Sequence, residues 1–162
     1  FFNATVGGPM RGHEHLHDAN IDWGQGLLYL KSWYDRHPEA RPFHLAYFGT
    51  VDPRLAGIEF SLPPRASSSF PSEAGASTDP GGPQPGWHAV AVNLFCVDVR
   101  WAKDGHGGAE KVGAIDYDYF LRFDPVATAG YCIYIYHIDC AEANRVRKQL
   151  GMPPVACKDA LE

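Results

Sequence analysis

The sequence predicts an α/β fold, with a layered, mostly parallel sheet of about four strands, flanking helices and one long Pro/Gly/Ser-rich loop. Strand-like and helix-like segments alternate along the chain, which is typical of this class. Residues 130–138, "GYCIYIYHI", are nearly apolar throughout, as expected for a strand buried on both faces. The length of 162 residues fits a single domain, and we assign residues 1–162 to it.

Four segments are predicted as strands. They alternate polar with apolar residues, or they are apolar runs bounded by Gly and Pro. The predicted strands are residues 12–18, 43–49, 86–97 and 130–138. The first of them, "GHEHLHD", has a period of two.

Helices are predicted where apolar residues recur at helical spacing. Residues 23–37 place their apolar side chains on one helical face and end before a proline. Residues 116–123 form one or two helical turns. Residues 139–151 form the last helix, with Asp139 as its cap and Glu142 three residues later, the spacing of a capping box.

Two segments are predicted as loops. Residues 61–86 are dominated by Ser, Pro and Gly, and such a stretch buries too little apolar surface to offset its ordering entropy. We therefore expect a flexible, partly disordered surface loop inserted within the domain. Residues 102–108, "AKDGHGG", are expected to be a second, shorter loop.

Composition narrows the class of protein. The net charge is −5 and no basic run occurs, so a nucleic-acid partner is not expected. The longest mainly apolar run, residues 127–136, is too short to span a membrane. The chain begins with "FFN" rather than Met, so we expect it to be a piece of a longer protein.

The cysteines give no metal signature. Cys96, Cys132, Cys140 and Cys157 form no C-x-x-C pair, so a zinc ribbon is not indicated. Three complete disulfide pairings are possible and the sequence does not choose among them. The simplest interpretation is that the four cysteines are free and buried.

Polar residues follow the predicted strands and define a candidate binding crevice. In a parallel sheet, ligands gather beyond the carboxyl ends of the strands. The candidates for ligand binding there are Asp18, Asn20, Asp22, Gln25, Asp52 and Asn93. Thr50 also follows a predicted strand, and His137 and Asp139 lie at the end of the last one. These residues would join the same rim if all the strands were parallel.

The stretch "DANIDWGQ" also has a purely structural interpretation. Asp22 can cap the helix that follows, with Gln25 at the third helical position reaching back to the cap. We expect the stretch to serve both purposes, with Asp22 and Gln25 capping the helix while Asp18 and Asn20 face the crevice. Asn20→Ala should then cost little stability, because surface changes usually stay within about 0.5 kcal/mol. Unfolding of the domain by Asn20→Ala would instead support the purely structural interpretation.

Three alternating histidines are weak candidates for a metal site. His13, His15 and His17 share one face of a strand but spread over about 13 Å at about 3.3 Å per residue. Zn–N bonds are only about 2 Å long, so the three cannot easily ligate one ion, although two could with Asp18. We predict no bound metal, no cofactor and no catalytic residue. The G-x-S-x-G, H-E-x-x-H and P-loop motifs do not occur.

Several blocks together resemble bacterial glycosyltransferase family 39-like membrane proteins, which are relatives of the protein-mannosyltransferases. "FFNATVGGPMRG" resembles the segment after their last transmembrane helix, and residues 18–27 resemble their D-S-N-x-D-W-G-Q-D-L pattern, with Ala19 and Gly26 departing from it. The further blocks are "YFGTVDP" at 47–53, "PGWHAVAV" at 85–92 and "PVATAGYCIYIYHI" at 125–138.

The resemblance implies an extracytoplasmic domain of a larger membrane protein, on the periplasmic face of the cytoplasmic membrane. The parent protein would transfer a sugar from a polyprenyl-phosphate carrier, with its catalytic acidic residues in the membrane part. This chain would then lack transfer activity of its own. Its partners would be its own membrane-embedded domain and a lipid-linked sugar, or a glycan or protein acceptor. The histidine run is not part of the family pattern.

Two alternatives from other classes remain open. One is a free-standing, metal-dependent α/β hydrolase that uses Asp18, Asp22 and the histidines. The other is a carbohydrate-binding module that stacks sugars on Trp23, Trp87 and Tyr47, for which core packing is the competing explanation.

Overall fold

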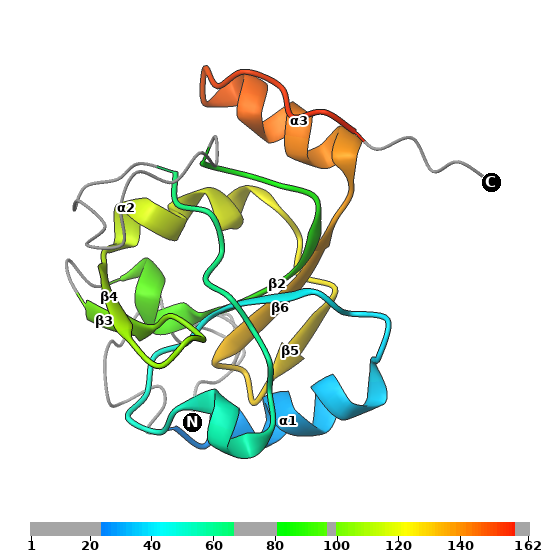
Figure 1. Ribbon diagram of the computed structural model, residues 1–162. Coiled ribbons are helices and arrows are strands. Elements are labelled where there is room, and N and C mark those ends of the chain that lie inside the picture. Colours follow the sequence, from blue (N-terminus) through cyan, green and yellow to red (C-terminus); the bar gives the residue numbers. More distant parts are fainter. Residues whose placement is uncertain (1–23, 67–80, 97–99, 158–162) are drawn as a thin grey trace, which may run out of the picture.

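The computed structural model describes residues 24–66, 81–96 and 100–157 (Figure 1). The predicted strand at 12–18 and most of the predicted long loop, residues 67–80, lie outside these ranges. The helices are α1 (Gly26–Arg36), α2 (Ala114–Tyr117) and α3 (Cys140–Gln149), with 3₁₀ helices η4 (Pro53–Ala56), η5 (Val92–Phe95) and η6 (Asp118–Arg122). The strands are β1 (Phe43–Ala46), β2 (Gly86–Ala91), β3 (Arg100–Lys103), β4 (Ala109–Val112), β5 (Ala127–Ala129) and β6 (Ile133–Ile138).

The main sheet has the strand order β1-β2-β6-β5 and is mixed. β1 pairs with β2 in parallel, whereas β6 runs antiparallel to both β2 and β5. Ser61 adds a parallel bridge to His44 on the outer side of β1. The α/β class is confirmed, but the described part of the sheet is not mostly parallel, because a tight turn between β5 and β6 reverses the chain.

Helices cover both faces of this sheet (Figure 1). On one face Trp33 of α1 packs against Trp87 of β2, with ring centroids 5.6 Å apart. On the other face Phe120 of η6 lies 5.1 Å from the Tyr136 ring of β6. Leu45 on β1 is fully buried between these layers. Burial of apolar side chains on both faces explains why the central strands are almost continuously apolar.

The predicted element boundaries are confirmed in outline. Helix α1 occupies most of the predicted helix 23–37. β1 is shorter than the predicted strand 43–49. β2 ends at Ala91, just before η5 begins at Val92, rather than at residue 97. The predicted strand 130–138 is the second half of a hairpin, and the sequence does not predict the first strand of that hairpin, β5.

The last helix agrees closely with its sequence prediction. Asp139 is the N-cap of α3, and its side chain accepts a hydrogen bond from the Glu142 N–H at 2.8 Å. The Glu142 carboxylate accepts from the Asp139 N–H at 3.3 Å, which completes the capping box. Two helix N–H groups thus gain acceptors from adjacent side chains.

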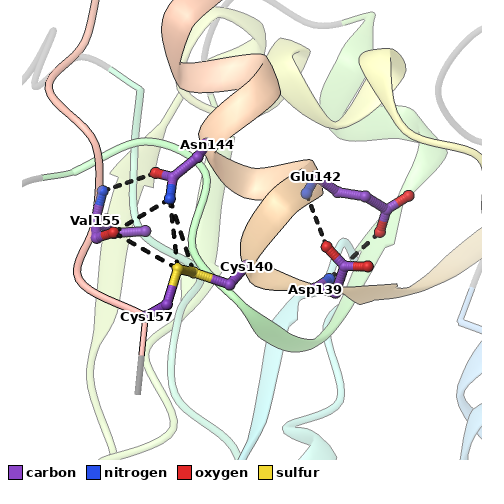
Figure 2. The surroundings of a disulfide bond; sticks show 6 residues. All are labelled: Asp139, Cys140, Glu142, Asn144, Val155 and Cys157. Carbon is purple, nitrogen blue, oxygen red and sulfur yellow. Dashed lines mark hydrogen bonds between the residues drawn. A yellow bond between two sulfur atoms is a disulfide. The ribbon is translucent and has the colours of Figure 1, made fainter. Parts of the chain in front are cut away.

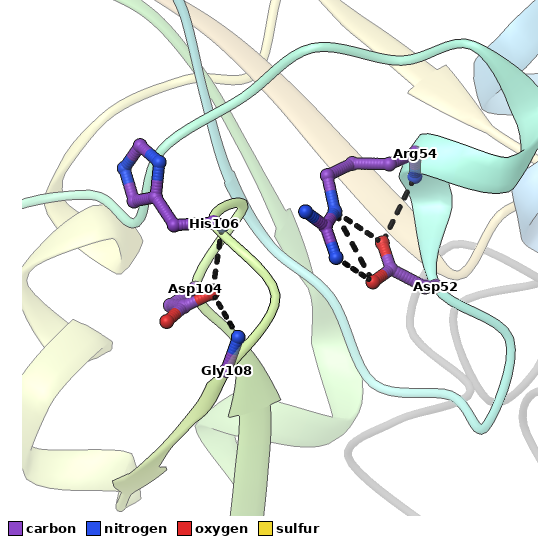
Figure 3. A network of polar contacts seen from close by, with 5 residues as sticks. All are labelled: Asp52, Arg54, Asp104, His106 and Gly108. Carbon is purple, nitrogen blue, oxygen red and sulfur yellow. Dashed lines mark hydrogen bonds and ion pairs between the residues drawn. The ribbon is translucent and has the colours of Figure 1, made fainter.

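The predicted short loop 102–108 is the tip of a hairpin. β3 and β4 pair antiparallel and form a second, two-stranded sheet. The Asp104 carboxylate accepts hydrogen bonds from the backbone N–H of His106 at 2.7 Å and of Gly108 at 2.9 Å (Figure 3). The loop prediction holds for the tip, but the flanking residues are strands.

The two described ends of the long loop meet. The Gly82 N–H donates to the Arg65 carbonyl at 2.7 Å. Arg147 of α3 is fully buried and donates to the carbonyls of Gly81 at 2.6 Å and Pro83 at 3.0 Å. Residues 61–66 and 81–86 therefore form an ordered base, although the sequence predicts flexibility over the whole of 61–86.

A disulfide joins Cys140, at the start of α3, to Cys157 (Figure 2). Cys96 and Cys132 are free. The prediction of four free, buried cysteines is therefore wrong for this pair. The 17-residue separation carries no local signal, because only the fold of the segment after α3 brings the two sulfurs together.

Candidate functional site

The structure places three of the six predicted crevice residues, Gln25, Asp52 and Asn93. Asp18, Asn20 and Asp22 lie outside the described residues, as do the histidines His13, His15 and His17. Gln25 is exposed and occupies the N-cap position of α1, without a side-chain capping hydrogen bond. It is therefore not at the third helical position, as the predicted capping box requires, because the helix begins only at Gly26.

Asp52 has a local structural role. Its carboxylate caps η4 by accepting from the Arg54 N–H at 3.0 Å, and it forms an ion pair with the Arg54 guanidinium at 2.7 Å (Figure 3). The hydrogen bond from the Arg54 side chain holds the pKa of Asp52 below its usual value. The Asp52 carboxylate is charged and accessible. Most of its hydrogen-bond acceptor positions are already occupied by Arg54 within η4.

Asn93 lies in η5, directly after β2, and is only 1% exposed. Its Oδ1 atom is buried without a hydrogen-bond partner. Such a group is costly, because a buried unpaired acceptor loses its hydration without compensation. Asn93 therefore follows β2 in the chain, but it lies in the interior of the domain rather than on an open crevice.

The rim proposed from parallel strands does not include the end of β6. Gly86, at the start of β2, pairs with Ile138, at the end of β6. Since the two strands are antiparallel, His137 and Asp139 lie at the opposite edge of the sheet from Asn93. His137 stacks on Trp87, with ring centroids 4.4 Å apart, and Asp139 caps α3.

A more concentrated polar group surrounds the base of the long loop. We call it the Arg65 cluster, and it consists of Arg65, Glu110, Asp116 and Tyr117. Arg65 forms an ion pair with Glu110 of β4. The Ala66 N–H donates to the Asp116 carbonyl at 2.9 Å, which ties the start of the loop to α2. These residues are distant in sequence, so only the tertiary structure brings them together.

Two members of the Arg65 cluster are fully buried with incompletely satisfied oxygens. Asp116 Oδ2 accepts from the Gly113 N–H at 2.8 Å, but Oδ1 of the same carboxylate has no partner, and neither has the Tyr117 hydroxyl. Burial raises the pKa of Asp116 above its usual value, and the Gly113 N–H and Arg65 partly oppose the shift. Burial also raises the pKa of Tyr117.

The Arg65 cluster is the most site-like arrangement in the described part of the chain. It combines a guanidinium with carboxyl and hydroxyl groups whose pKa values are perturbed, and perturbed groups concentrate at functional sites and in structural ion-pair networks alike. Helix α2 packs against η5, which carries Asn93. From the sequence, residues 116–123 are predicted only to form helical turns, although the repeated acidic and aromatic residues of this segment are a signal for such a cluster.

A second polar arrangement crosses the sheet. The His44 and His88 rings stack with centroids 4.9 Å apart, and His44 Nδ1 lies 2.9 Å from the Ser61 hydroxyl. A serine beside a histidine suits nucleophilic catalysis when a third group orients the base. Here Ser61 also exchanges two backbone hydrogen bonds with β1, which explains its position by sheet pairing alone.

The proposed sugar-stacking aromatics are largely packed in the core. Tyr47 is fully buried, and Trp87 is partly buried between Trp33 and His137. Trp23 lies outside the described residues. Packing of this kind leaves Tyr47 no free ring face for a ligand. Of the three aromatic residues proposed to stack on sugars, Tyr47 therefore cannot do so.

Within residues 24–66, 81–96 and 100–157, no three His, Cys, Asp or Glu side chains are placed to hold one metal ion. In the same ranges no helix is both long and apolar enough to cross a membrane.

Comparison with known proteins adds no assignment. No protein-family model matches the chain, and neither a curated protein nor a solved structure matches it.

Proposed function

We propose that this chain is a non-catalytic, extracytoplasmic domain of a bacterial membrane glycosyltransferase that uses a lipid-linked sugar donor. The observation that carries the proposal is the ordered series of sequence blocks that resemble the glycosyltransferase family 39-like proteins. They occur in the family's order from the first residues to Ile138.

Two of the described blocks lie at the centre of the fold. "PGWHAVAV" is essentially β2, and "PVATAGYCIYIYHI" is the β5–β6 hairpin, so these two blocks lie side by side in the sheet. Their side chains are mostly buried. Resemblance in these central strands favours a shared scaffold, which supports a recognition or structural role rather than a catalytic one.

The Cys140–Cys157 disulfide supports the proposed location. Disulfides persist mainly in oxidising compartments such as the bacterial periplasm and are rare in the cytosol. On this proposal the domain lies on the periplasmic face of the cytoplasmic membrane, against its own membrane-embedded domain. There it contributes to binding of the polyprenyl-phosphate sugar or of the glycan or protein acceptor.

The location is tested by topology. In spheroplasts that carry the native full-length protein, added protease should digest this domain while a cytoplasmic marker stays intact. Recovery of the chain as a soluble protein after cell fractionation would reject the proposal and favour a free-standing enzyme.

The role is tested by sugar transfer in isolated membranes, with a labelled sugar on a polyprenyl-phosphate carrier. The isolated chain should transfer nothing. In the full-length protein Asn20→Ala should reduce transfer or acceptor binding, whereas Lys148→Ala, at an exposed position of α3, should not. Hydrolytic activity in the isolated chain, together with stoichiometric zinc lost on His13→Ala, would instead support the metal-dependent hydrolase.

A further inference from the structure

The Cys140–Cys157 disulfide lies at the surface, at the first turn of α3. Cys157 is exposed and Cys140 is half-buried, so a soluble thiol can approach the pair from the Cys157 side. Cys140 is the first residue of a ten-residue helix, whose N-terminal N–H groups favour negative charge nearby. These two conditions distinguish this disulfide from one enclosed in a core.

Asn144, one turn further along α3, contacts both sulfurs and the segment that they fasten (Figure 2). Its Nδ2 group lies 3.5 Å from Cys157 Sγ and 3.7 Å from Cys140 Sγ. The same side-chain amide donates to the Val155 carbonyl at 3.2 Å and accepts from the Val155 N–H at 2.8 Å. Asn144 therefore holds the segment of residues 152–157 against α3, and its Nδ2 group can also donate a hydrogen bond to a sulfur of the disulfide.

We propose that the Cys140–Cys157 disulfide is a reversible thiol-exchange site, opened by a dithiol reductant, whose opening releases residues 152–157 from α3. This inference goes beyond the proposed function and does not depend on it.

The exchange proceeds in two balanced steps. A thiolate of the reductant attacks Cys157 Sγ, a new S–S bond forms between them, and the Cys140–Cys157 bond breaks with Cys140 leaving as a thiolate. The second thiolate of the reductant then attacks the mixed disulfide and releases Cys157 as a thiolate. The reductant is oxidised to its cyclic disulfide, and the two cysteines take up two electrons and, according to pH, two protons.

Cys140 is the better leaving group of the pair. A thiol leaves faster when its thiolate is more stable, and a helix N-terminus is one of the environments that stabilise a thiolate. The Asn144 amide adds a hydrogen-bond donor. The carboxylates of Asp139 and Glu142 oppose this effect, but each accepts a hydrogen bond from a backbone N–H of the capping box.

Release of the segment would reach the base of the long loop. The Met152 N–H donates to the Arg147 carbonyl at 2.9 Å, and the Arg147 side chain donates to the Pro153 carbonyl at 2.6 Å. The same guanidinium holds Gly81 and Pro83. Arg147 therefore connects the fastened segment to both the helix and the loop base.

The first experiment measures reduction of the intact chain under native conditions. The protein is treated with dithiothreitol, alkylated and analysed peptide by peptide. Cys140 and Cys157 should become labelled while Cys132, only 4% exposed in the core, stays unlabelled and so reports that the domain remains folded. If Cys140 and Cys157 are labelled only when Cys132 is labelled too, the disulfide opens only when the domain unfolds. It is then a purely structural cross-link and the proposal fails.

The second experiment follows the released segment by amide hydrogen exchange. Reduction should let the segment detach, so that the Val155 N–H separates from its acceptor on Asn144 and exchanges at least about tenfold faster. Exchange at Val146 within α3 should stay unchanged. Unchanged exchange at Val155 would overturn the proposal, since the segment would then be held without the disulfide.

A variant separates the role of Asn144. In Cys157→Ser protein the Cys140 thiol should react with iodoacetamide near neutral pH, and adding Asn144→Ala should slow this reaction about threefold or more, because a donor to the thiolate is removed. Lys148→Ala, one turn further along the same face of α3, is the matched control and should leave the rate unchanged. Equal alkylation rates in Cys157→Ser alone, with Asn144→Ala and with Lys148→Ala would show that Asn144 does not stabilise the Cys140 thiolate. The proposed reason why Cys140 is the leaving group would then be wrong.

Discussion

His88 shows how a single buried side chain fixes its own protonation state. It is fully buried, and its Nε2 atom lies 3.0 Å from the Gln84 carbonyl oxygen. Because a carbonyl only accepts, Nε2 carries the hydrogen and Nδ1 holds the lone pair. Nδ1 is buried without a partner, so a second proton would place an unpaired charge in the core. Burial, with smaller effects from His44 and His137, lowers the pKa of His88 to about 3.

Acid should therefore destabilise the domain through His88. The unfolded chain binds a proton near its ordinary pKa of 6.5, whereas the folded chain binds it only near about 3, so stability falls as the pH drops from 6.5 towards 3. At pH 5 the loss from this residue is about 2 kcal/mol. Urea unfolding at pH 7.5 and pH 5 measures it.

The control for this prediction is a histidine of the same chain. His88→Gln, which keeps a donor for the Gln84 carbonyl, should flatten the pH dependence below 6.5. His106→Gln, at an exposed position in the β3–β4 turn, should not. An unchanged slope in the His88 variant would show that this residue is protonated without unfolding.

At the scale of elements, local signals decide where each element begins and ends. The start of α3 is set by the Asp139–Glu142 capping box, which is legible in the sequence. The β5–β6 turn is set by Gly130 and Tyr131, which both adopt left-handed φ, at 61° and 63°. A tyrosine with left-handed φ is strained and therefore uncommon. For this reason the sequence does not predict a turn inside this apolar run.

Removal of the cap should weaken α3. Asp139→Ala should cost about 1 kcal/mol, the usual loss when an N-cap acceptor is removed, and Asp139→Asn should cost only a few tenths, because asparagine caps about equally well. Thermal unfolding of the two variants provides the comparison. Equal losses in both would mean that the charge of Asp139, rather than its hydrogen bond, supports the helix.

The β5–β6 turn offers a stabilising substitution. Tyr131→Asn should raise stability by about 0.5 kcal/mol, because asparagine tolerates left-handed φ and Tyr131 is 59% exposed. Tyr131→Val should lower it by about 1 kcal/mol, since a β-branched side chain fits that conformation least well. The melting midpoints should follow the order Asn, Tyr, Val, and a reversed order would show that packing of the Tyr131 ring outweighs the backbone strain.

At the scale of the whole molecule, the base of the long loop joins the sheet, α2 and α3. Arg65 and Gly82 are already linked by a hydrogen bond, and Gly81 has a left-handed φ of 63°. If Ala66 were joined directly to Gly81, residues 65, 66, 81 and 82 would form a four-residue turn closed by the same hydrogen bond.

Deletion of residues 67–80 should therefore leave the domain folded, with a melting midpoint at or slightly above that of the intact chain. Shortening a loop lowers its closure entropy only weakly, by about 1 to 2 kcal/mol here. A deletion of 67–83 is the contrasting variant and should be destabilising, because it also removes the carbonyls that Arg147 binds. A fall in the midpoint for the shorter deletion would contradict the prediction.

The sequence predicts the local features of this fold better than the distant ones. The α/β class, the last helix with its cap and the positions of β1, β2 and β6 follow from periodicity and from Gly and Pro signals. The direction of β6 depends on the strained turn at Tyr131, and the disulfide and the Arg65–Glu110 pair depend on chain segments that only folding brings together. Of the predicted crevice residues, Asp52 is the N-cap of η4 and Asn93 lies in η5, and the sequence predicts neither of these 3₁₀ helices. The burial of Asn93 is a tertiary property.

The order of strands in the sheet has a consequence for how the chain folds as it is synthesised. β2 lies at the centre, paired with β1 on one side and with β6 on the other. β6 is made last of the four strands, so β1 and β2 leave the ribosome before the partner that completes their sheet exists. Until Ile138 has emerged, the apolar strand β2 presents an open edge, which is a site for association with other nascent chains. The β5–β6 hairpin can form locally, and its docking onto β2 should be the slow step, because that pairing closes a long stretch of chain.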